Sequence, residues 1–362
     1  MLSWWTNVIG GFPEDYKNLT ADLVFDPEKG LGLNVIRFVI PGGDNPTHNH
    51  IRPEGEVSGY WPCLTCNFDW SADEHQRWAL FASRERGANI FEANSASPPY
   101  WMTISNCSSG SVGGTSDNLD PLYYDAFAKY LTKVVSWYKE QGITFRTISP
   151  FNEPSAGWWK ALGYQEGCHY SCSTMNEIAI KVANNLMAMG LNDTSISISD
   201  EFSIVQEIFT INCIDNTTKT YVSQYNTHGY GAVQDDPQGS NGWGLIGVSY
   251  TNSSELPKTH LDFYAFKQYT KFIRPDDDDT LATYSDKDQK LVIVCTNKGA
   301  TQSWNFNVNM FNISNITAFR TSSNNEMLTP LLNIPPINNG SLIYSHPSDS
   351  ITTWVFDAIP DL

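Results

Sequence analysis

Short apolar runs alternate with longer amphipathic stretches over residues 12–228. Compact runs rich in β-branched and aromatic residues predict buried strands, whereas apolar positions spaced three and four apart predict helices. The expected strands are 34–40, 88–93, 145–151, 195–199 and 221–226, and the expected helices are 72–86, 121–141, 174–189 and 205–209. Strands and helices in this order indicate parallel strands joined by right-handed helical crossovers.

The pattern changes near the run Pro275–Asp279. Five short alternating runs follow, separated by turns rich in Asn and Ser, and they predict strands at 291–296, 303–308, 316–320, 341–344 and 351–356. We therefore expect a catalytic-type barrel domain over 1–275 and an all-β sandwich domain over 276–362. The aspartate run lacks the alternating ligand spacing of a known calcium loop, which favours a solvated surface loop.

Polar side chains stand at the ends of the predicted parallel strands: Arg37, Asn94, Asn152, Glu153, Asp200, Glu201 and His228. In a TIM (β/α)₈ barrel, the carboxyl ends of the strands carry the chemistry. A doubly wound α/β sheet is the alternative, but no glycine-rich phosphate loop follows the early strands. The sequence thus favours an α/β fold of the barrel type.

Charge restricts the class of partner. The net charge is −17 and the pI is about 4.7, which argues against nucleic acid and anionic membranes. No stretch approaches the roughly 20 apolar residues of a membrane span. The chain also holds 12 Trp and 17 Tyr, and those in loop-like positions, such as Trp158, Trp159 and Trp243, suit stacking on sugar rings as well as core packing.

The cysteines and glycosylation motifs predict a secreted, disulfide-bonded glycoprotein. Seven cysteines accompany eight Asn-X-Ser/Thr motifs, at Asn18, Asn106, Asn192, Asn216, Asn252, Asn312, Asn315 and Asn339. A zinc site built from Cys63, Cys66, Cys168 and Cys172 is an alternative to disulfides. No signal peptide is visible, and the cysteine count is odd, so we expect an incomplete sequence. We expect no cofactor and no metal, and interpret His48, His50 and His169 as loop histidines.

The sharpest feature is Glu153, which lies between Asn152 and Pro154 at the end of a predicted strand. Hydrolysis of a glycosidic bond needs one carboxyl that protonates the leaving oxygen and a second that attacks or activates water. Asn152 is placed to hydrogen-bond a neighbouring sugar hydroxyl. The alternative is an ordinary acid at a strand end, and the position midway along the strand–helix alternation favours catalysis.

Several segments in the same order resemble glycoside hydrolase family 30, and most closely the fungal endo-β-1,6-galactanases. The resemblance spans nearly the whole chain and rests on 2–5, 34–37, 97–102, 149–154, 199–202, 226–230, 241–246 and 272–275. It implies a barrel with a side β-sandwich, a retaining mechanism, and β-1,6-linked galactan as the substrate. It also implies that Glu153 is the acid/base and that a sugar subsite is lined by Arg37, Asn152, Glu201, His228, Tyr230 and Trp243.

One part of the family pattern is missing. Its nucleophile is a glutamate at the end of the seventh barrel strand, but only about a dozen residues separate His228 from Trp243, whereas a βα unit needs roughly 30. We therefore expect the seventh-strand region and its glutamate to be absent and the N-terminus to be truncated. Glu201, Asp235 and Asp236 are the remaining candidates for a second carboxylate.

Three functional hypotheses follow. The first is a secreted, monomeric glycoside hydrolase that acts on the polysaccharide β-1,6-galactan with Glu153 as its general acid/base; β-1,6-glucan and xylan are the alternative substrates. The second is a catalytically inactive, carbohydrate-binding relic of such an enzyme. The third is that the sequence is a mispredicted or exon-skipped form of an intact enzyme. We also expect poor solubility, because loss of two strands would expose sheet edges.

Overall fold

The computed structural model describes residues 5–228, 245–248, 252–259, 261–272, 282–297 and 300–361. The chain forms two compact units. The first consists of residues 1–17 and 34–239, and the second of residues 18–33 and 240–362. The boundary predicted at 275/276 stays a prediction, because it lies between described segments.

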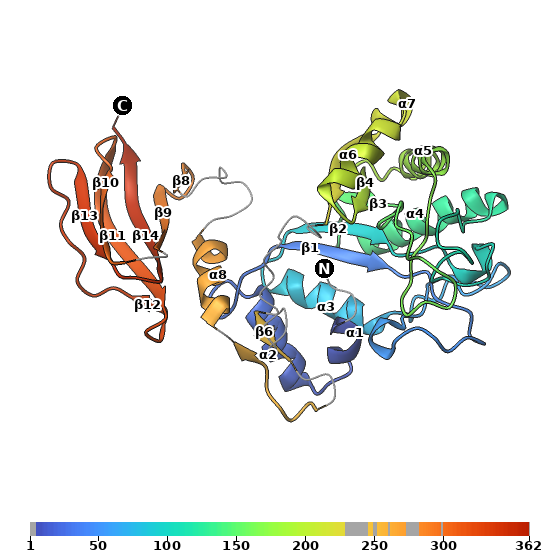
Figure 1. Cartoon of the computed structure of the whole chain (residues 1–362), viewed down its shortest axis with the longest axis horizontal. Coiled ribbons are helices and arrows are strands. Elements are labelled where there is room, and N and C mark those ends of the chain that lie inside the picture. The colour runs from blue at the N-terminus through green and yellow to red at the C-terminus, as the bar shows by residue number, and fades with distance from the viewer. Residues whose placement is uncertain are drawn as a thin grey trace. The chain divides into compact units, whose positions relative to one another are not determined.

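A five-stranded parallel sheet organises the first unit (Figure 1). Its strands are β1 (Val35–Ile40), β2 (Ile90–Ser95), β3 (Thr147–Ser149), β4 (Ser195–Glu201) and β5 (Val222–Thr227). Their spatial order is their chain order, without the reversal that defines a doubly wound sheet. All five predicted strands are confirmed, and β1 and β5 are the two edges of this sheet within the described part of the chain.

Helices flank this sheet and connect its strands (Figure 1). They are α1 (Trp5–Ile9), α3 (Glu74–Glu85), α4 (Tyr124–Glu140), α5 (Cys172–Ala188), α6 (Ile204–Cys213) and α7 (Asn216–Lys219), while α2 (Glu14–Phe25) spans the division between the units. Ser171 and Ser203 begin α5 and α6 as N-caps, accepting hydrogen bonds from the backbone N–H groups of Thr174 and Gln206. The four predicted helices are confirmed.

The core of the first unit lies where the helices meet the sheet. Strand residues such as Phe38 and Ile148 and helix residues such as Phe127 and Leu131 are fully buried. In α4 the buried positions recur at helical spacing, as its sequence predicts. On the edge strand β5, by contrast, every second residue is exposed, including Tyr225.

The second unit is mostly antiparallel. Its larger sheet has the order β12-β11-β14-β9-β8 and its smaller sheet pairs β10 with β13. The strands are β8 (Ala282–Ser285), β9 (Lys290–Asn297), β10 (Gln302–Asn307), β11 (Phe311–Ser322), β12 (Glu326–Pro330), β13 (Ser341–His346) and β14 (Ser350–Pro360). Both sheets contribute to one core, in which Trp354 of β14 and Leu342 of β13 are fully buried. The predicted β-rich module is therefore confirmed as a set of mostly antiparallel strands.

The sequence did not predict some elements of this unit. Strands β8 and β12 and helix α8 (Leu261–Phe272) were not anticipated, nor was the short pair β6 (Ile246–Gly247) and β7 (Lys258–Thr259). No helix of the described residues has the length and apolarity to span a membrane.

Two disulfides join loops and helix ends of the first unit, Cys63–Cys66 and Cys172–Cys213. The prediction of disulfides is therefore confirmed. The alternative zinc site was wrong, because three of its four cysteines are oxidised and carry no free thiolate. Cys107, Cys168 and Cys295 are unpaired and buried.

Candidate active site

The guanidinium of Arg37 connects the carboxyl-end loops of the parallel sheet. Its Nη2 donates to Asn152 Oδ1 at 2.9 Å and forms an ion pair with Asp200 Oδ1 at 3.2 Å. The amide of Asn94, oriented to satisfy both of its neighbours, accepts from the same Nη2 at 2.9 Å and donates to the Phe38 carbonyl. Arg37 thereby holds together residues from β1, β2 and β4 and from the loop after β3.

Glu153 lies in the loop after β3 and is held by its backbone and by its carboxylate. Its N–H donates to the Asp200 carbonyl at 3.0 Å, and both residues adopt the left-handed backbone region, with φ of 49° and 57°. That conformation is uncommon for non-glycine residues and clusters at functional sites. His228 Nδ1 lies 2.7 Å from Glu153 Oε1, and the indole N–H of Trp158 donates to Oε2 at 3.1 Å.

Trp158 and Trp159 follow Glu153 in the same loop and differ in exposure. The indole N–H of Trp159 donates to the Glu153 carbonyl at 2.9 Å, and this ring is buried. Gly167 leaves room for it, since a Cβ there would lie 2.1 Å from the Trp159 ring. Trp158 is 51% exposed and packs edge-on against Phe202. Trp158 therefore presents an apolar face to solvent beside the Glu153 carboxylate.

Glu201 lies at the same sheet edge, but its carboxylate is fully buried. Its oxygens accept hydrogen bonds from Ser155 Oγ at 2.9 Å and Thr210 Oγ1 at 2.8 Å. Burial raises the pKa of Glu201, and the two hydroxyl donors oppose that shift. The side chain thus connects β4 to α6 and to the loop after Glu153.

Glu207 of α6 is a buried acid that the sequence analysis missed. Its Oε2 accepts from Ser199 Oγ at 3.0 Å and from the Glu201 backbone N–H at 3.4 Å. Burial raises the pKa of Glu207 to about 7, and the nearby Glu201 adds to the shift. An acid in a surface-type helix gives no sequence signal of this inward contact, because acids in such helices usually face water.

The predicted site residues are partly brought together. Arg37, Asn152, Glu153 and His228 share one hydrogen-bonded network at the carboxyl end of the sheet, with Asp200 as an additional member. Glu201 lies on the neighbouring strand but is directed into the protein. Tyr230, Trp243, Asp235 and Asp236 lie outside the described residues.

A model of O-glycosyl hydrolase family 30 matches residues 2–227, which is more than half of the chain. The chain belongs to this family. The resemblance predicted from its motifs is therefore confirmed, and so is its class as a glycoside hydrolase by family. Glu153 and its partners all lie within the matched segment or directly beside it.

An endo-β-1,6-galactanase from Hypocrea rufa is 27% identical over 410 residues, covering 91% of this chain and 82% of the relative. An endo-1,6-β-D-glucanase from Neurospora crassa is 27% identical over 131 residues, covering 34% of this chain and 26% of that relative. The catalytic domain of a family 30 xylanase C from Talaromyces cellulolyticus shares the fold, with a TM-score of 0.73 at 17% identity over 96% of this chain and 93% of that one.

Proposed function

We propose that this chain is built as a retaining glycoside hydrolase with Glu153 as its general acid/base. The hydrogen bonds of His228 and Trp158 to the two carboxylate oxygens carry the proposal, because they orient the carboxyl group at the carboxyl end of the sheet. Arg37 and Asn152 would bind the hydroxyls of the sugar, and the exposed ring of Trp158 would stack on it. Glu201 would position the loop rather than contact the substrate.

The proposed substrate is β-1,6-linked galactan. The similarity to an endo-β-1,6-galactanase over 91% of this chain supports it, whereas the similarity to an endo-1,6-β-D-glucanase covers only 34%. A neutral polymer also agrees with the net charge of −17, which would disfavour acidic glycans.

We further propose that the catalytic nucleophile is missing from this chain. The family match ends at residue 227, at the last strand of the parallel sheet. The alignment with the galactanase has 410 positions, but 91% of 362 residues is only about 330, so about 80 positions of the relative have no counterpart here. Gaps of that total length correspond to roughly two βα units, which is the size of the region that we expect to be missing after His228.

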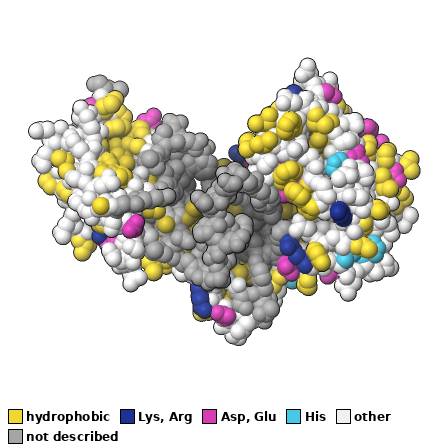
Figure 2. Space-filling model, viewed as in Figure 1, with side chains coloured by type: hydrophobic (Ala, Val, Ile, Leu, Met, Phe, Trp, Pro, Cys, Tyr) yellow, Lys and Arg dark blue, Asp and Glu magenta, His cyan; other side chains and the backbone are white. Residues whose placement is uncertain are grey.

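The exposed apolar face of α6 supports the same proposal. Ile204, Val205, Ile208 and Phe209 lie on one side of this helix and are 50–64% exposed. Figure 2 shows hydrophobic side chains gathered on this part of the first unit. In a closed barrel the next helix would cover this face, and the next strand would pair with β5.

Secretion and glycosylation belong to the same proposal. All eight glycosylation motifs have an exposed asparagine, in both units of the chain, as attachment of a bulky glycan requires. The two disulfides also agree with an oxidising compartment. The barrel and sandwich architecture completes the proposed description, with a monomeric state for the form whose barrel is closed.

The second candidate function is carbohydrate binding without hydrolysis. It follows from the same site, because the sugar-facing groups around Glu153 remain while the second carboxylate of the pair does not. Oligosaccharide binding without release of products would favour it. The two candidate functions share the described site around Glu153. They differ only in whether a further segment supplies the nucleophile.

The test compares the chain with a repaired variant. The aligned galactanase segment that has no counterpart here is inserted after His228, and both proteins are assayed on de-arabinosylated β-1,6-galactan, β-1,6-glucan and xylan. We expect no oligosaccharides from the chain itself and release from galactan by the repaired variant, falling by at least about a hundredfold in Glu153→Gln. Release by the unrepaired chain that disappears in Glu153→Gln would overturn the missing-nucleophile proposal.

A further inference from the structure

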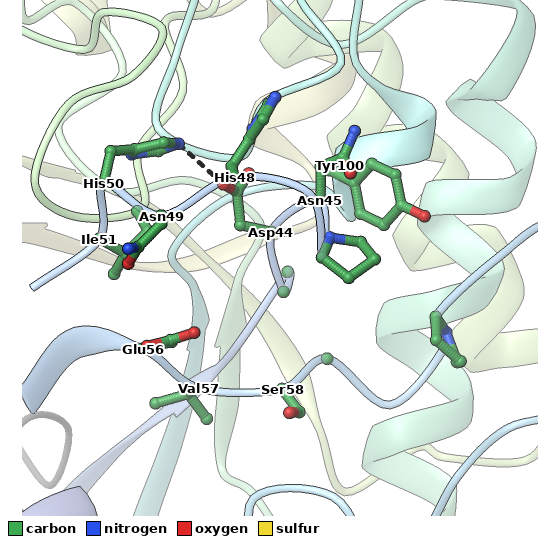
Figure 3. Close-up of a pocket in the computed structure, with 15 residues that line it drawn as sticks. Asp44, Asn45, His48, Asn49, His50, Ile51, Glu56, Val57, Ser58 and Tyr100 are labelled. Atoms are coloured by element: carbon green, nitrogen blue, oxygen red, sulfur yellow. Dashed lines mark hydrogen bonds and ion pairs between the residues drawn. The ribbon is translucent and has the colours of Figure 1, made fainter. Parts of the chain in front are cut away.

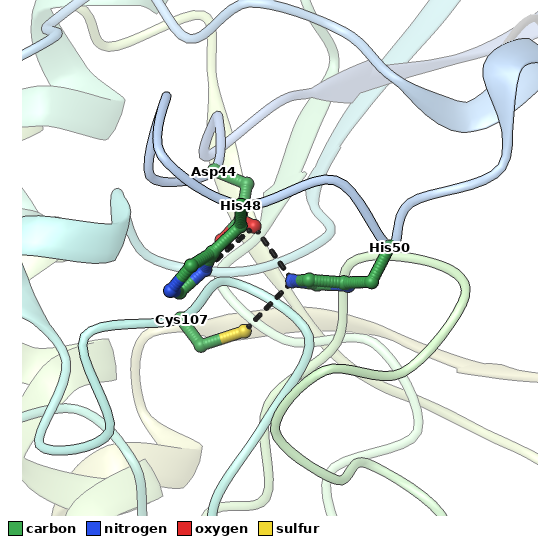
Figure 4. Close-up of side chains that lie close together, drawn as sticks. All are labelled: Asp44, His48, His50 and Cys107. Atoms are coloured by element: carbon green, nitrogen blue, oxygen red, sulfur yellow. Dashed lines mark hydrogen bonds and ion pairs between the residues drawn. The ribbon is translucent and has the colours of Figure 1, made fainter.

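A cavity of about 350 Å³ lies beside the loop that follows β1, and its lining includes Asp44, His48, His50 and Tyr100 (Figure 3). From the sequence, His48 and His50 were interpreted as loop histidines with no catalytic role. Their ring nitrogens instead face the Asp44 carboxylate, and Figure 4 shows Cys107 from a separate loop completing the group. One nitrogen, oxygen or sulfur atom from each of the four residues lies within 4.8 Å of all the others.

The hydrogen bonds of His50 determine which of its nitrogens holds a proton. Nδ1 lies 2.6 Å from the Gly163 carbonyl, which can only accept, so Nδ1 carries hydrogen. A neutral ring then presents a lone pair at Nε2. That lone pair faces Asp44 Oδ2 at 2.8 Å and Cys107 Sγ at 3.3 Å. Two lone-pair atoms at this distance need a cation between them, either a proton on the imidazole or a metal ion.

Neighbouring residues also orient the other atoms of the group that could bind a metal ion. Asp44 Oδ1 accepts from the N–H of Ser108 at 2.7 Å and from its hydroxyl at 3.0 Å, which leaves Oδ2 directed at His50 and also at His48 Nδ1, 3.2 Å away. The Cys107 sulfur accepts a hydrogen bond from the Leu162 N–H at 3.3 Å, which holds the sulfur in position. Outer contacts of this kind hold the ligands of metal sites in proteins.

We propose that Asp44, His48, His50 and Cys107 bind one divalent zinc-type cation. Two imidazoles, a carboxylate and a thiolate form a four-ligand set of the kind that Zn²⁺ prefers. Tetrahedral bonds of about 2.0–2.3 Å separate donor atoms by roughly 3.3–3.8 Å, so small side-chain rotations from the present spacing are sufficient. Cys107 is buried and the other three side chains are 12–23% exposed, which leaves the site reachable from the cavity.

The position of the site gives the ion a structural role. It joins the loop after β1 to the loop around Cys107, and Ser109 in turn contacts Lys160 and Gly163. Residues 160–163 directly continue the loop that carries Trp158 and Trp159, whose indoles hold Glu153. A bound ion would stabilise these loops without touching the proposed acid/base, so the inference does not depend on catalytic activity.

The test uses the full chain, stripped with a chelator and titrated with zinc chloride or cobalt chloride. We expect one zinc per chain by elemental analysis after dialysis and a rise in Tm of about 5 °C or more at a hundredfold excess over Kd. Cobalt should give the visible bands of a tetrahedral ion and a near-ultraviolet thiolate band. The thiolate band should vanish in Cys107→Ser, and tight zinc binding should vanish in His50→Ala.

The matched controls are His169→Ala and Cys168→Ser, because His169 pairs with Asp117 and Cys168 is a second buried thiol. Both should bind zinc as the parent does. If His50→Ala does not fold by circular dichroism in chelator, His48→Gln replaces it. Absence of stoichiometric zinc from the folded parent, equal binding by the folded ligand variants, or a Cys107–Cys168 disulfide in peptide mass spectrometry would overturn the proposal.

Discussion

The imidazole of His228 lies 2.7 Å from the carboxylate of Glu153 and joins the residue after β5 to the loop after β3. Since Glu153 is almost completely buried, removing this partner leaves a carboxylate oxygen without its donor. We expect His228→Ala to lower the free energy of unfolding by about 1–2 kcal/mol. Urea denaturation measures this loss, which should shrink in a Glu153→Gln background; an equal loss there would show that the two side chains are not coupled.

Arg37 neutralises Asp200, whose side chain is only 4% exposed. Among the described residues, Asp200 Oδ2 has no hydrogen-bond partner, so the ion pair through Oδ1 is its main compensation. Replacing Arg37 by Met should therefore cost about 3 kcal/mol, because a buried charge is left unpaired. The same replacement in an Asp200→Asn chain is the control and should cost less. Equal losses in the two backgrounds would contradict the charge argument.

Trp158 should contribute to sugar binding through its exposed ring. Trp158→Ala is expected to weaken the binding of β-1,6-galacto-oligosaccharides about three- to tenfold, the effect of losing one aromatic contact. Trp158→Phe keeps a ring but removes the N–H that donates to Glu153, and should bind with intermediate affinity. Isothermal titration calorimetry separates the variants, and unchanged affinity in Trp158→Ala would place the sugar elsewhere.

The sequence predicted the backbone of the site better than its side-chain contacts. Strand periodicity placed Arg37 and Glu153 at the same sheet edge, because parallel strands bring their carboxyl ends together. It could not show that Glu201 turns inward to Thr210, since alternation along a strand says nothing about what an end residue contacts. Nor could it bring Cys107 to His50, because contacts between loops 57 residues apart in the chain depend on tertiary packing.

Helix α8 illustrates a second limit. The predicted domain division at 275/276 assigns this helix to the barrel domain. Its Gln268, however, accepts a hydrogen bond from Thr353 of β14. Local periodicity does not reveal which domain a helix packs against. The family motifs were more informative than periodicity here, because their order along the chain indicated the family that the family model confirms, and it is the basis for proposing a missing segment after His228.

Asp73 should make folding stability depend on pH. Burial raises its pKa from 3.8 to about 7, against hydrogen bonds from Gln76 and Tyr60 that favour the charged form. Between about pH 4 and 7 the folded chain thus keeps a proton on Asp73 that the unfolded chain loses. The contribution of this proton to the free energy of unfolding is fully present below about pH 4 and is lost as the pH rises to about 7. Asp73→Asn should flatten the fall in unfolding free energy measured between pH 4 and 7. An unchanged slope would show that Asp73 is ionised when folded.

The apolar face of α6 predicts concentration-dependent self-association. Ile208 and Phe209 are 54% and 64% exposed, and with Ile204 and Val205 they form a contiguous apolar strip next to the edge strand β5. Such patches drive association in water, as do open sheet edges. Sedimentation velocity of the purified chain should therefore show oligomers that grow with concentration.

Phe209→Lys should shift that distribution towards monomer, since it places a charge in the strip. Asn184→Lys is the matched control, because it adds the same charge to an exposed polar position of helix α5, outside the strip. It should leave the association largely unchanged. The repaired variant with the inserted galactanase segment should behave as Phe209→Lys does, because its added helix would cover the strip. A parent chain that stays monomeric at all concentrations would contradict both the exposed face and the deletion proposed to cause it.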